Sequence, residues 1–283
     1  MTNDVLPLSF AIGGELPVRR LGLGTMNLTG PGVWGEPRDV TQAIRLLRRA
    51  VELGVTLVDT ADSHGPEVGE RLIRQALHPY PDGLVIAGKA GLARTGPGRW
   101  HPLGRPEYLR QQVELSLRHL ALDRIDLFQL HRIDPRVPLA DQLGALADLR
   151  REGKIRHLGL CEVDLTQLRQ AREITPIATV QNRYNLADRR WEQVLEYCTA
   201  EGIGFLPWQP LQAGELACPG GPLAGIATGR ETTPAQFALA WLLHRSPVLL
   251  PIPGTSRQAH LEENLAAAQV QLSEAEFRAL SAR

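Results

Sequence analysis

The chain has 283 residues, of which 43% are hydrophobic and 22% are charged, as in an ordinary globular protein. Basic and acidic residues number 31 each, so no excess of charge points to nucleic acid or to an anionic membrane as a partner. The three cysteines lie far apart without a CxxC spacing, which argues against a disulfide framework and against a zinc site. No apolar run is long enough to span a membrane and MTNDVLPLSF lacks the pattern of a signal peptide, so we expect a cytoplasmic enzyme.

Short β-type runs alternate with longer helical stretches almost to the end of the chain. The runs are apolar on consecutive positions, which is typical of parallel strands buried on both faces. They cover residues 20–27, 56–61, 83–90, 124–131, 155–163, 178–185, 203–210 and 247–254. Between them, apolar residues recur at helical spacing. These stretches cover residues 40–54, 106–122, 139–154, 164–174, 189–202 and 234–246, with Gly54 as a stop signal, Pro106 in a first turn and Asp164 as an N-cap.

Eight strands alternating with helices predict an α/β fold, namely a single (β/α)8 TIM barrel domain over residues 1–283. The alternative is an open doubly wound sheet, but the GxGxxG fingerprint of that fold is absent after the first strand. Before that strand, LSFAIGGELPVR predicts an N-terminal β-hairpin that plugs the bottom of the barrel. We expect the Gly- and Pro-rich residues 91–106 to form a loop that shapes a pocket, together with Trp34 and Trp100.

Polar side chains end strands that are otherwise apolar. In a barrel the carboxyl ends of the strands meet at one mouth, where active sites are built. Taken singly, Asp59 is explained as a turn cap, Lys89 as a strand-end lysine and His131 as a core histidine. Their placement on consecutive strands favours a shared site instead. In chain order the strand ends carry Gly24, Thr25, Asp59, Lys89, His131, Cys161, Glu162, Gln181, Trp208 and Thr255.

Several motifs in the same order resemble the aldo-keto reductase family over nearly the whole chain. They are GLGTMNL, LVDTADSHG, IAGKA, IDLFQLHR, GKIRHLGLCEV, VQNRYN, PWQPL and PIPGTSRQAHLEENLAA. The resemblance implies a barrel that binds NADP(H) and reduces a small aldehyde or ketone. It also implies that Asp59 and Lys89 tune a proton donor and that His131 orients the substrate.

The family's proton donor is a tyrosine, and the matching position of this chain is His64. A histidine beside Lys89 is expected to be neutral, because a nearby cation disfavours its charged form. Neutral imidazole still donates through one nitrogen, and it also serves as a base. The substitution therefore leaves both reduction and a non-redox reaction open.

The resemblance also implies the residues that bind the cofactor. The family's Ser-Asn pair is replaced by Cys161 and Glu162, while Gln181 is retained. An ionised glutamate accepts hydrogen bonds only, so Glu162 is either a neutral variant or a change in how nicotinamide is held. Trp208 supplies an apolar face for nicotinamide or packs in the core. At the phosphate end we expect contacts from Thr255, Ser256, Arg257, His260, Glu263 and Asn264, with a histidine at position 260 weakening the case for NADP.

Three functions therefore remain open. The first is NADP(H)-dependent reduction of an aldehyde or ketone, with His64 in place of the tyrosine acid. The second is a non-redox lyase, dehydratase, isomerase or cyclase that uses His64, His131, Lys89 and Glu162 for acid–base work. The third is a nucleotide-binding protein without turnover. A barrel fold does not separate them, because barrels host many chemistries. The sequence sets neither the substrate nor the oligomeric state.

Overall fold

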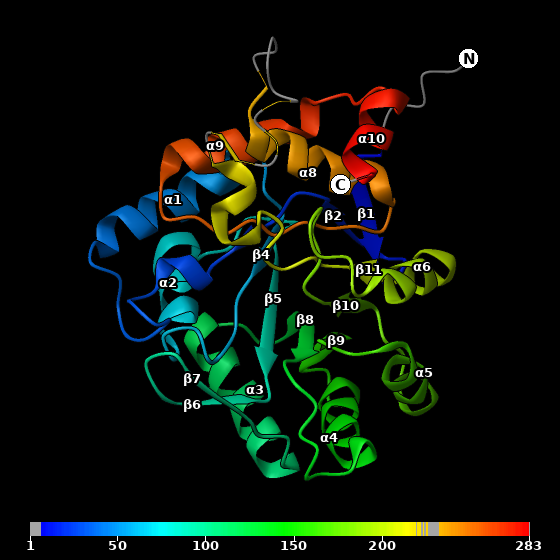
Figure 1. The fold of residues 1–283 in the computed structure, drawn as a ribbon. Coiled ribbons are helices and arrows are strands. Elements are labelled where there is room, and N and C mark those ends of the chain that lie inside the picture. Colours follow the sequence, from blue (N-terminus) through cyan, green and yellow to red (C-terminus); the bar gives the residue numbers. More distant parts are fainter. Residues whose placement is uncertain (1–6, 219, 222, 224, 226–231, 283) are drawn as a thin grey trace.

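Seven parallel strands form a curled sheet at the centre of the molecule (Figure 1). The computed structural model describes residues 7–218, 220, 221, 223, 225 and 232–282. The strand order is β11-β10-β9-β8-β5-β4-β3, with every neighbouring pair parallel. The strands are β3 (Leu23–Gly24), β4 (Leu57–Asp59), β5 (Val85–Ala90), β8 (Ile125–Leu130), β9 (Ile155–Cys161), β10 (Thr179–Gln181) and β11 (Gly204–Phe205).

The eighth wall segment, residues 248–254, closes the sheet into a barrel. Parallel bridges join Phe205 to Leu249 on one side and Gly24 to Gly254 on the other. Leu250 N donates to Phe205 O at 2.8 Å, but Pro251 and Pro253 have no N–H to donate and contribute only carbonyls, as where Gly22 N donates to Pro251 O at 2.9 Å. This explains why an apolar run that was predicted as a strand has no regular ladder. The predicted α/β barrel is confirmed.

Helices cover the outside of the barrel (Figure 1). They are α1 (Val40–Glu52), α2 (Val68–Leu77), α3 (Pro106–Leu120), α4 (Leu139–Arg151), α5 (Leu165–Ile174), α6 (Glu192–Glu201), α8 (Pro234–Arg245), α9 (Gln258–Ala266) and α10 (Glu274–Ser281), with short 3-10 turns at Met26–Leu28, Gln212–Ala217 and Ala267–Gln269. Asp164 caps α5 by accepting from Gln167 N, and Pro106 opens α3, both as predicted. Helices α2, α9 and α10 lie outside the predicted helical stretches.

A hairpin of β1 (Ser9–Ile12) and β2 (Leu16–Arg19) closes one end of the barrel, as predicted. Its Ile12, Leu16 and Val18 are buried in one cluster with Leu57, Val85, Leu127, Leu206, Leu250 and Ile252. Leu57 and Val85 are the first residues of β4 and β5, so the hairpin seals the end opposite the carboxyl ends. The open mouth is therefore at those carboxyl ends.

The segment predicted as a plain loop contains a second antiparallel hairpin, β6 (Leu92–Gly96) and β7 (Arg99–Pro102), which corrects the expectation for residues 91–106. The Gly and Pro residues that suggested a loop supply the turn, where Gly96 and Gly98 have positive φ. This hairpin folds over the barrel mouth and contributes a cation to the site described below.

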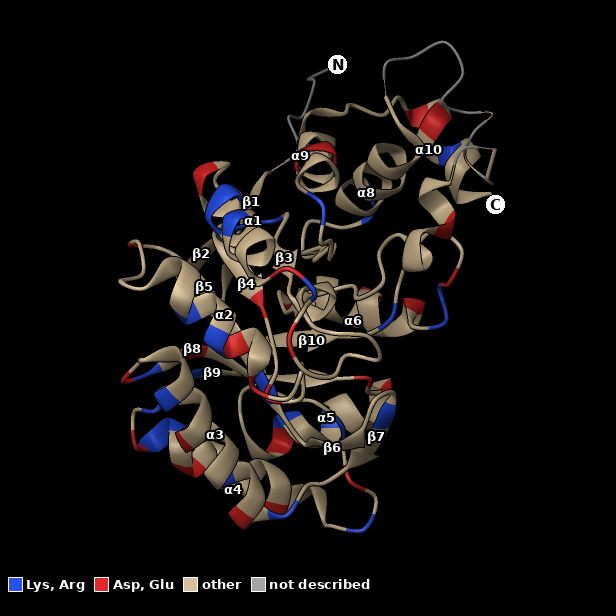
Figure 2. Cartoon of the chain, turned by 90° about the vertical axis from the view of Figure 1, so that its left-hand side faces the viewer, with Lys and Arg blue, Asp and Glu red and all other residues tan. Residues whose placement is uncertain are grey.

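Basic and acidic residues intermingle on the outer helices, as α3 and α4 show in Figure 2, in keeping with the balanced net charge. Within the described part of the chain, no helix is long and apolar enough to cross a membrane.

Candidate active site

A buried ion pair joins the ends of β4 and β5. Lys89 Nζ lies 2.6 Å from both carboxylate oxygens of Asp59 and 2.7 Å from Thr60 O. Asp59 Oδ1 also accepts from Gln181 Nε2 at 2.8 Å and Gln129 Nε2 at 3.3 Å. Buried charges are tolerated only when they are paired and hydrogen-bonded, and this pair meets both conditions. The Lys89 ammonium and the Asp59 carboxylate are therefore held in fixed positions at the base of the mouth.

Two histidines lie beside this pair and both are neutral. His64, from the loop after β4, and His131, at the end of β8, have ring centroids 6.3 Å apart in an edge-to-face arrangement. Burial, aided by the charges of Lys89 and Arg94, lowers the pKa of His64 well below its usual range. Burial and the charge of Lys89 do the same to the pKa of His131. Both rings are therefore neutral imidazoles at physiological pH.

Hydroxyl groups hold the two rings. Thr25 Oγ1 lies 3.5 Å from His64 Nδ1, and it also donates to Asp59 O at 3.1 Å. Ser63 Oγ lies 3.3 Å from His131 Nδ1. Because each hydroxyl contacts Nδ1, the Nε2 atom of each imidazole is the one left to meet a substrate.

Arg94 is a functional candidate that the sequence did not reveal. Its guanidinium, on β6, donates to Ser63 O at 2.8 Å and Val33 O at 2.6 Å. It also lies 3.6 Å from the ring centroid of Trp100 and 5.7 Å from that of Trp34. Arg94 thus ties the β6–β7 hairpin to the loop that carries His64. The sequence analysis missed Arg94 because it does not end a barrel strand. Only the β6–β7 hairpin brings it to the mouth.

Glu162 and Trp208 form a second polar pair at the mouth. Glu162 Oε1 accepts from Trp208 Nε1 and from Arg183 N, both at 2.6 Å. Glu162 also has a positive φ of 51°, a conformation that few non-glycine residues adopt. The carboxylate therefore fixes the indole ring rather than pointing freely into the mouth. Cys161 faces inward, 4.0 Å from Gln129 Oε1, and burial raises the pKa of its thiol to about 12, so it is an unreactive thiol.

The predicted phosphate end lies at the start of α9. Thr255 is buried and its Oγ1 accepts from Arg257 N at 3.1 Å, whereas Ser256, Arg257 and His260 are exposed. The first helical bond runs from Leu261 N to Arg257 O at 3.1 Å, so the amides of the first turn point out of the helix. A Cβ on the neighbouring Gly24 would lie 2.9 Å from Ile252 O, which explains a glycine there. Amides, a hydroxyl and a guanidinium fit a phosphate group.

The remaining predicted residues of this end behave differently. Asn264 is buried on α9, and Glu263 is half-buried with its carbonyl accepting from Gln236 Nε2 at 3.2 Å. The structure thus brings Asp59, Lys89, His64, His131 and Gln181 into one group. It leaves Arg257 and His260 on the surface, after the carboxyl end of the eighth wall segment. Among the residues described, no cluster of His, Cys, Asp and Glu is suited to a metal ion.

All four tyrosines are engaged elsewhere. Tyr80 donates to Leu120 O, Tyr108 to Asp62, Tyr184 to Glu192, and Tyr197 meets Arg172. No tyrosine therefore takes the place beside Lys89, where His64 lies.

The buried Asp–Lys pair and the two neutral histidines at the mouth of the barrel form a candidate acid–base site. The sequence model of the Aldo/keto reductase family matches residues 20–218 and 221–282. The chain therefore belongs to the aldo/keto reductase family and is an oxidoreductase of that type. The predicted family resemblance is confirmed.

Three relatives illustrate this membership. An uncharacterized oxidoreductase of Schizosaccharomyces pombe is 51% identical over 267 residues, covering 94% of this chain and 87% of the relative. Pyridoxine 4-dehydrogenase of Escherichia coli is 42% identical over 267 residues, covering 92% and 93%. An aldo-keto reductase of Klebsiella pneumoniae, solved in complex with NADPH, superposes with a TM-score of 0.82 at 28% identity, covering 97% of this chain and 94% of that one.

Proposed function

We propose that this chain is an NADP(H)-dependent oxidoreductase that interconverts an aldehyde or ketone and its alcohol, with His64 exchanging the proton of the substrate oxygen. The observation that carries the proposal is the group of Asp59, Lys89, His64 and His131 at one mouth. The bound cofactor supplies or takes up the hydride. The residues of this chain bind and orient the substrate and manage the proton.

His64 is suited to that task because it is neutral. Thr25 Oγ1 gives its own hydrogen to Asp59 O and so accepts from His64 Nδ1, which leaves Nε2 to take the proton of an alcohol and, as imidazolium, to return it in the reverse reaction. Its Nε2 is then the atom that meets a hydroxyl or carbonyl oxygen of the substrate. Lys89 has its donors engaged by Asp59 and Thr60, so it acts as a fixed positive charge and not as an acid. His131 is the second imidazole that positions the same oxygen. Trp208, fixed by Glu162, would offer its ring face to the nicotinamide, and the amides of the first turn of α9 with Arg257 would hold the 2′-phosphate.

The non-redox alternative is weakened by two contacts. Glu162 was to share the acid–base work, but its Oε1 is engaged by Trp208 and Arg183. Lys89 is likewise held by Asp59. A non-redox reaction would be left with the two histidines alone, whereas the redox reaction needs only a proton from one of them.

Titration with NADPH and NADH, followed by cofactor fluorescence and tryptophan quenching, tests the proposal. Turnover is then assayed on a panel of small aldehydes and ketones that includes pyridoxal, because a 42% identical relative is a pyridoxine 4-dehydrogenase. Binding of NADPH with turnover of at least one carbonyl supports the proposal. Binding without turnover of any of them supports the nucleotide-binding or non-redox alternative.

A further inference from the structure

Arg94 joins three segments of the chain through its guanidinium. Nη1 donates to Val33 O at 2.6 Å and to Ser63 O at 2.8 Å, and Nη2 donates to Gly32 O at 2.7 Å. Gly32 and Val33 belong to the loop between β3 and α1, whereas Ser63 belongs to the loop between β4 and α2. The β6–β7 hairpin, which carries Arg94, lies beyond the carboxyl end of β5 (Figure 1). The guanidinium therefore fastens two loops of the barrel mouth to the hairpin, and we call these three hydrogen bonds the Arg94 clamp.

The hairpin holds the guanidinium in turn. Nε donates to Arg99 O at 3.1 Å and Nη2 to Gly96 O at 3.3 Å, and Cζ lies 3.6 Å from the centroid of the Trp100 ring. The register of the hairpin shifts between Arg94 and Gly96, and such a bulge re-aims a side chain. An arginine has five N–H donors in a rigid fork, and carbonyls of the described residues accept from all five. Arg94 is therefore built to fix the backbone and not to anchor a substrate anion.

The clamp acts on both neighbours of His64. The carbonyl of Ser63, which precedes it, is held by Arg94 directly. The carbonyl of Gly65, which follows it, accepts from Gly35 N at 2.7 Å. Gly35 belongs to the same β3–α1 loop that Arg94 fastens to the hairpin. Removal of the guanidinium would thus loosen the peptide groups on both sides of the imidazole.

The β3–α1 loop has a conformation that needs outside support. Val33 has a positive φ of 54°, which is unfavourable for a β-branched residue. At Gly32, with φ 68°, a Cβ would lie 2.9 Å from Pro97 Cβ, so only glycine lets the loop approach the hairpin turn this closely. Gly98 N of that turn donates to Gly32 O at 2.9 Å. Strained backbone persists only where its surroundings over-determine it, and here the hairpin turn and Arg94 supply those surroundings.

We propose that Arg94 is a positioning residue, which fixes the imidazole of His64 at the mouth by clamping the peptide groups that flank it. This inference rests on the proposed function. Proton exchange with the substrate oxygen depends on where Nε2 of His64 lies, and a displacement of about 1 Å at a reacting group can cost about 100-fold in rate. Ser63 also carries the hydroxyl that lies 3.3 Å from His131 Nδ1, so the same clamp steadies the second imidazole.

The charge of Arg94 has a smaller part in this role. Burial comes first and the charge of Lys89 second among the causes that lower the pKa of His64, and the charge of Arg94 comes third. We therefore expect His64 to stay neutral without Arg94. Arg94→Lys separates position from charge, because lysine keeps a positive charge and a long stem but presents it as a compact point, without the fork that reaches carbonyls of several segments.

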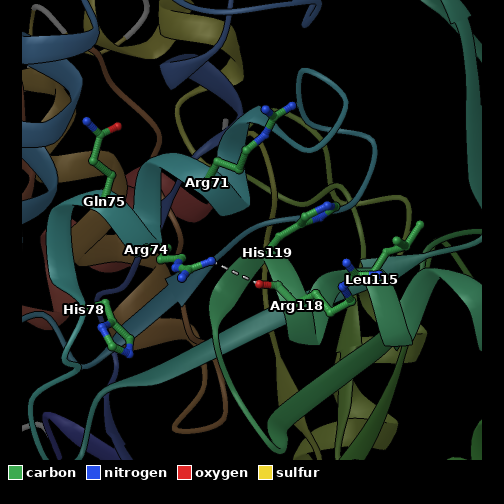
Figure 3. Close-up of a pocket in the computed structure, with 7 residues that line it drawn as sticks. All are labelled: Arg71, Arg74, Gln75, His78, Leu115, Arg118 and His119. Carbon is green, nitrogen blue, oxygen red and sulfur yellow. Dashed lines mark hydrogen bonds between the residues drawn. The ribbon is translucent and has the colours of Figure 1, made fainter.

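Nuclear magnetic resonance of histidine-labelled protein tests the clamp without any turnover. The ring signals of His64 are assigned by their loss in His64→Gln. We expect them to be shifted and broadened in Arg94→Lys and in Arg94→Ala, because the imidazole then samples several positions. The matched controls Arg118→Lys and Arg118→Ala should leave them unchanged, since Arg118 is an exposed arginine of α3 that lines a pocket of about 630 Å³ between α2 and α3 (Figure 3). Signals of His64 in Arg94→Lys that match those of the wild type overturn the proposal, whether or not the enzyme turns over any carbonyl.

Steady-state kinetics on an accepted carbonyl tests the consequence. Arg94→Lys and Arg94→Ala should lower kcat by about 10- to 100-fold, whereas the KM for NADPH should stay near that of the wild type, because the expected phosphate site at the start of α9 is a separate part of the mouth. Guanidinium ion at millimolar concentration should restore part of the kcat of Arg94→Ala, since it presents the same planar donors to the carbonyls, and ammonium ion should not. Wild-type kcat in folded Arg94→Lys, or equal rescue by the two ions, would show that only the charge of Arg94 matters and would overturn the clamp.

Discussion

Lys89 Nζ and both carboxylate oxygens of Asp59 form a pair at 2.6 Å, with side chains that are 1% and 5% exposed. Such a pair is worth little as a source of stability, but removing one member leaves an uncompensated charge in the interior. The pair also holds Gln181, which donates to Asp59 Oδ1 at 2.8 Å. Substitutions of Lys89 and Asp59 should therefore change the free energy of unfolding and the catalytic activity to different extents.

Lys89→Met should abolish most turnover and lower the free energy of unfolding by about 3–5 kcal/mol, the cost of leaving Asp59 charged and buried. Adding Asp59→Asn should recover most of the stability, since no buried charge remains, but none of the activity. Urea denaturation and NADPH consumption measure the two effects. Full activity in folded Lys89→Met would refute a functional role for the pair.

The buried neutral histidines predict a loss of stability in acid. His64 and His131 have folded-state pKa values well below their ordinary value, so below about pH 6.5 the unfolded chain binds more protons than the folded one. Each then costs up to about 1.4 kcal/mol per pH unit as the pH falls. Denaturant unfolding at several pH values should show this slope, and His64→Gln should reduce it by up to about 1.4 kcal/mol per pH unit. A slope unchanged in His64→Gln would contradict a neutral, buried His64.

Asp62 predicts the opposite trend. Its folded-state pKa of about 8 lies above the value of an unfolded aspartate, so the stability it contributes is complete in acid and is lost as the pH rises toward 8. Asp62→Asn keeps the shape of the side chain without the titration. Its stability should therefore decline less between about pH 4 and pH 8 than that of the wild type. Parallel curves for the two proteins would argue against a raised pKa.

Much of the candidate site could be predicted from the residues at the carboxyl ends of the predicted strands. Parallel strands of a barrel deliver their last residues to one mouth, so Asp59, Lys89 and His131 were predictable once the strands were. The eighth wall segment was predictable from its apolar run, although Pro251 and Pro253 prevent a regular ladder. Contacts across the barrel wall were not predictable. Arg94 reaches the mouth only because residues 92–102 form a hairpin. The charge of Glu70 acts on Asp62 only because α2, which the helical pattern did not show, follows that loop closely.

We expect the start of α9 to set the cofactor preference. NADPH should bind more tightly than NADH by about ten- to a hundredfold, the worth of charge-assisted hydrogen bonds to one phosphate. Arg257→Ala should narrow this ratio, whereas Arg278→Ala, an exposed arginine on α10, should not. Fluorescence titration measures both. An unchanged ratio in Arg257→Ala would show that another group meets the phosphate.

Glu162→Gln removes a negative charge from the mouth and retains an oxygen that accepts from Trp208. We expect it to weaken NADP⁺ binding more than NADPH binding, because only the oxidised nicotinamide ring is positively charged. The measurement is the ratio of the two dissociation constants in each protein. Equal losses for both forms would mean that Glu162 acts only by holding Trp208.

The central claim is that His64 exchanges the substrate proton in a redox reaction, and NADPH consumption by wild type, His64→Ala and His64→Tyr on one aldehyde panel tests it most directly. We predict that wild type reduces at least one aldehyde and that His64→Ala loses about 100- to 10,000-fold of that rate, as when a positioned acid–base group is removed. His64→Tyr should keep or increase the rate, because tyrosine remains a proton donor beside Lys89 and Asp59. Equal rates in wild type and His64→Ala, or reduction by His64→Tyr alone, would contradict the claim.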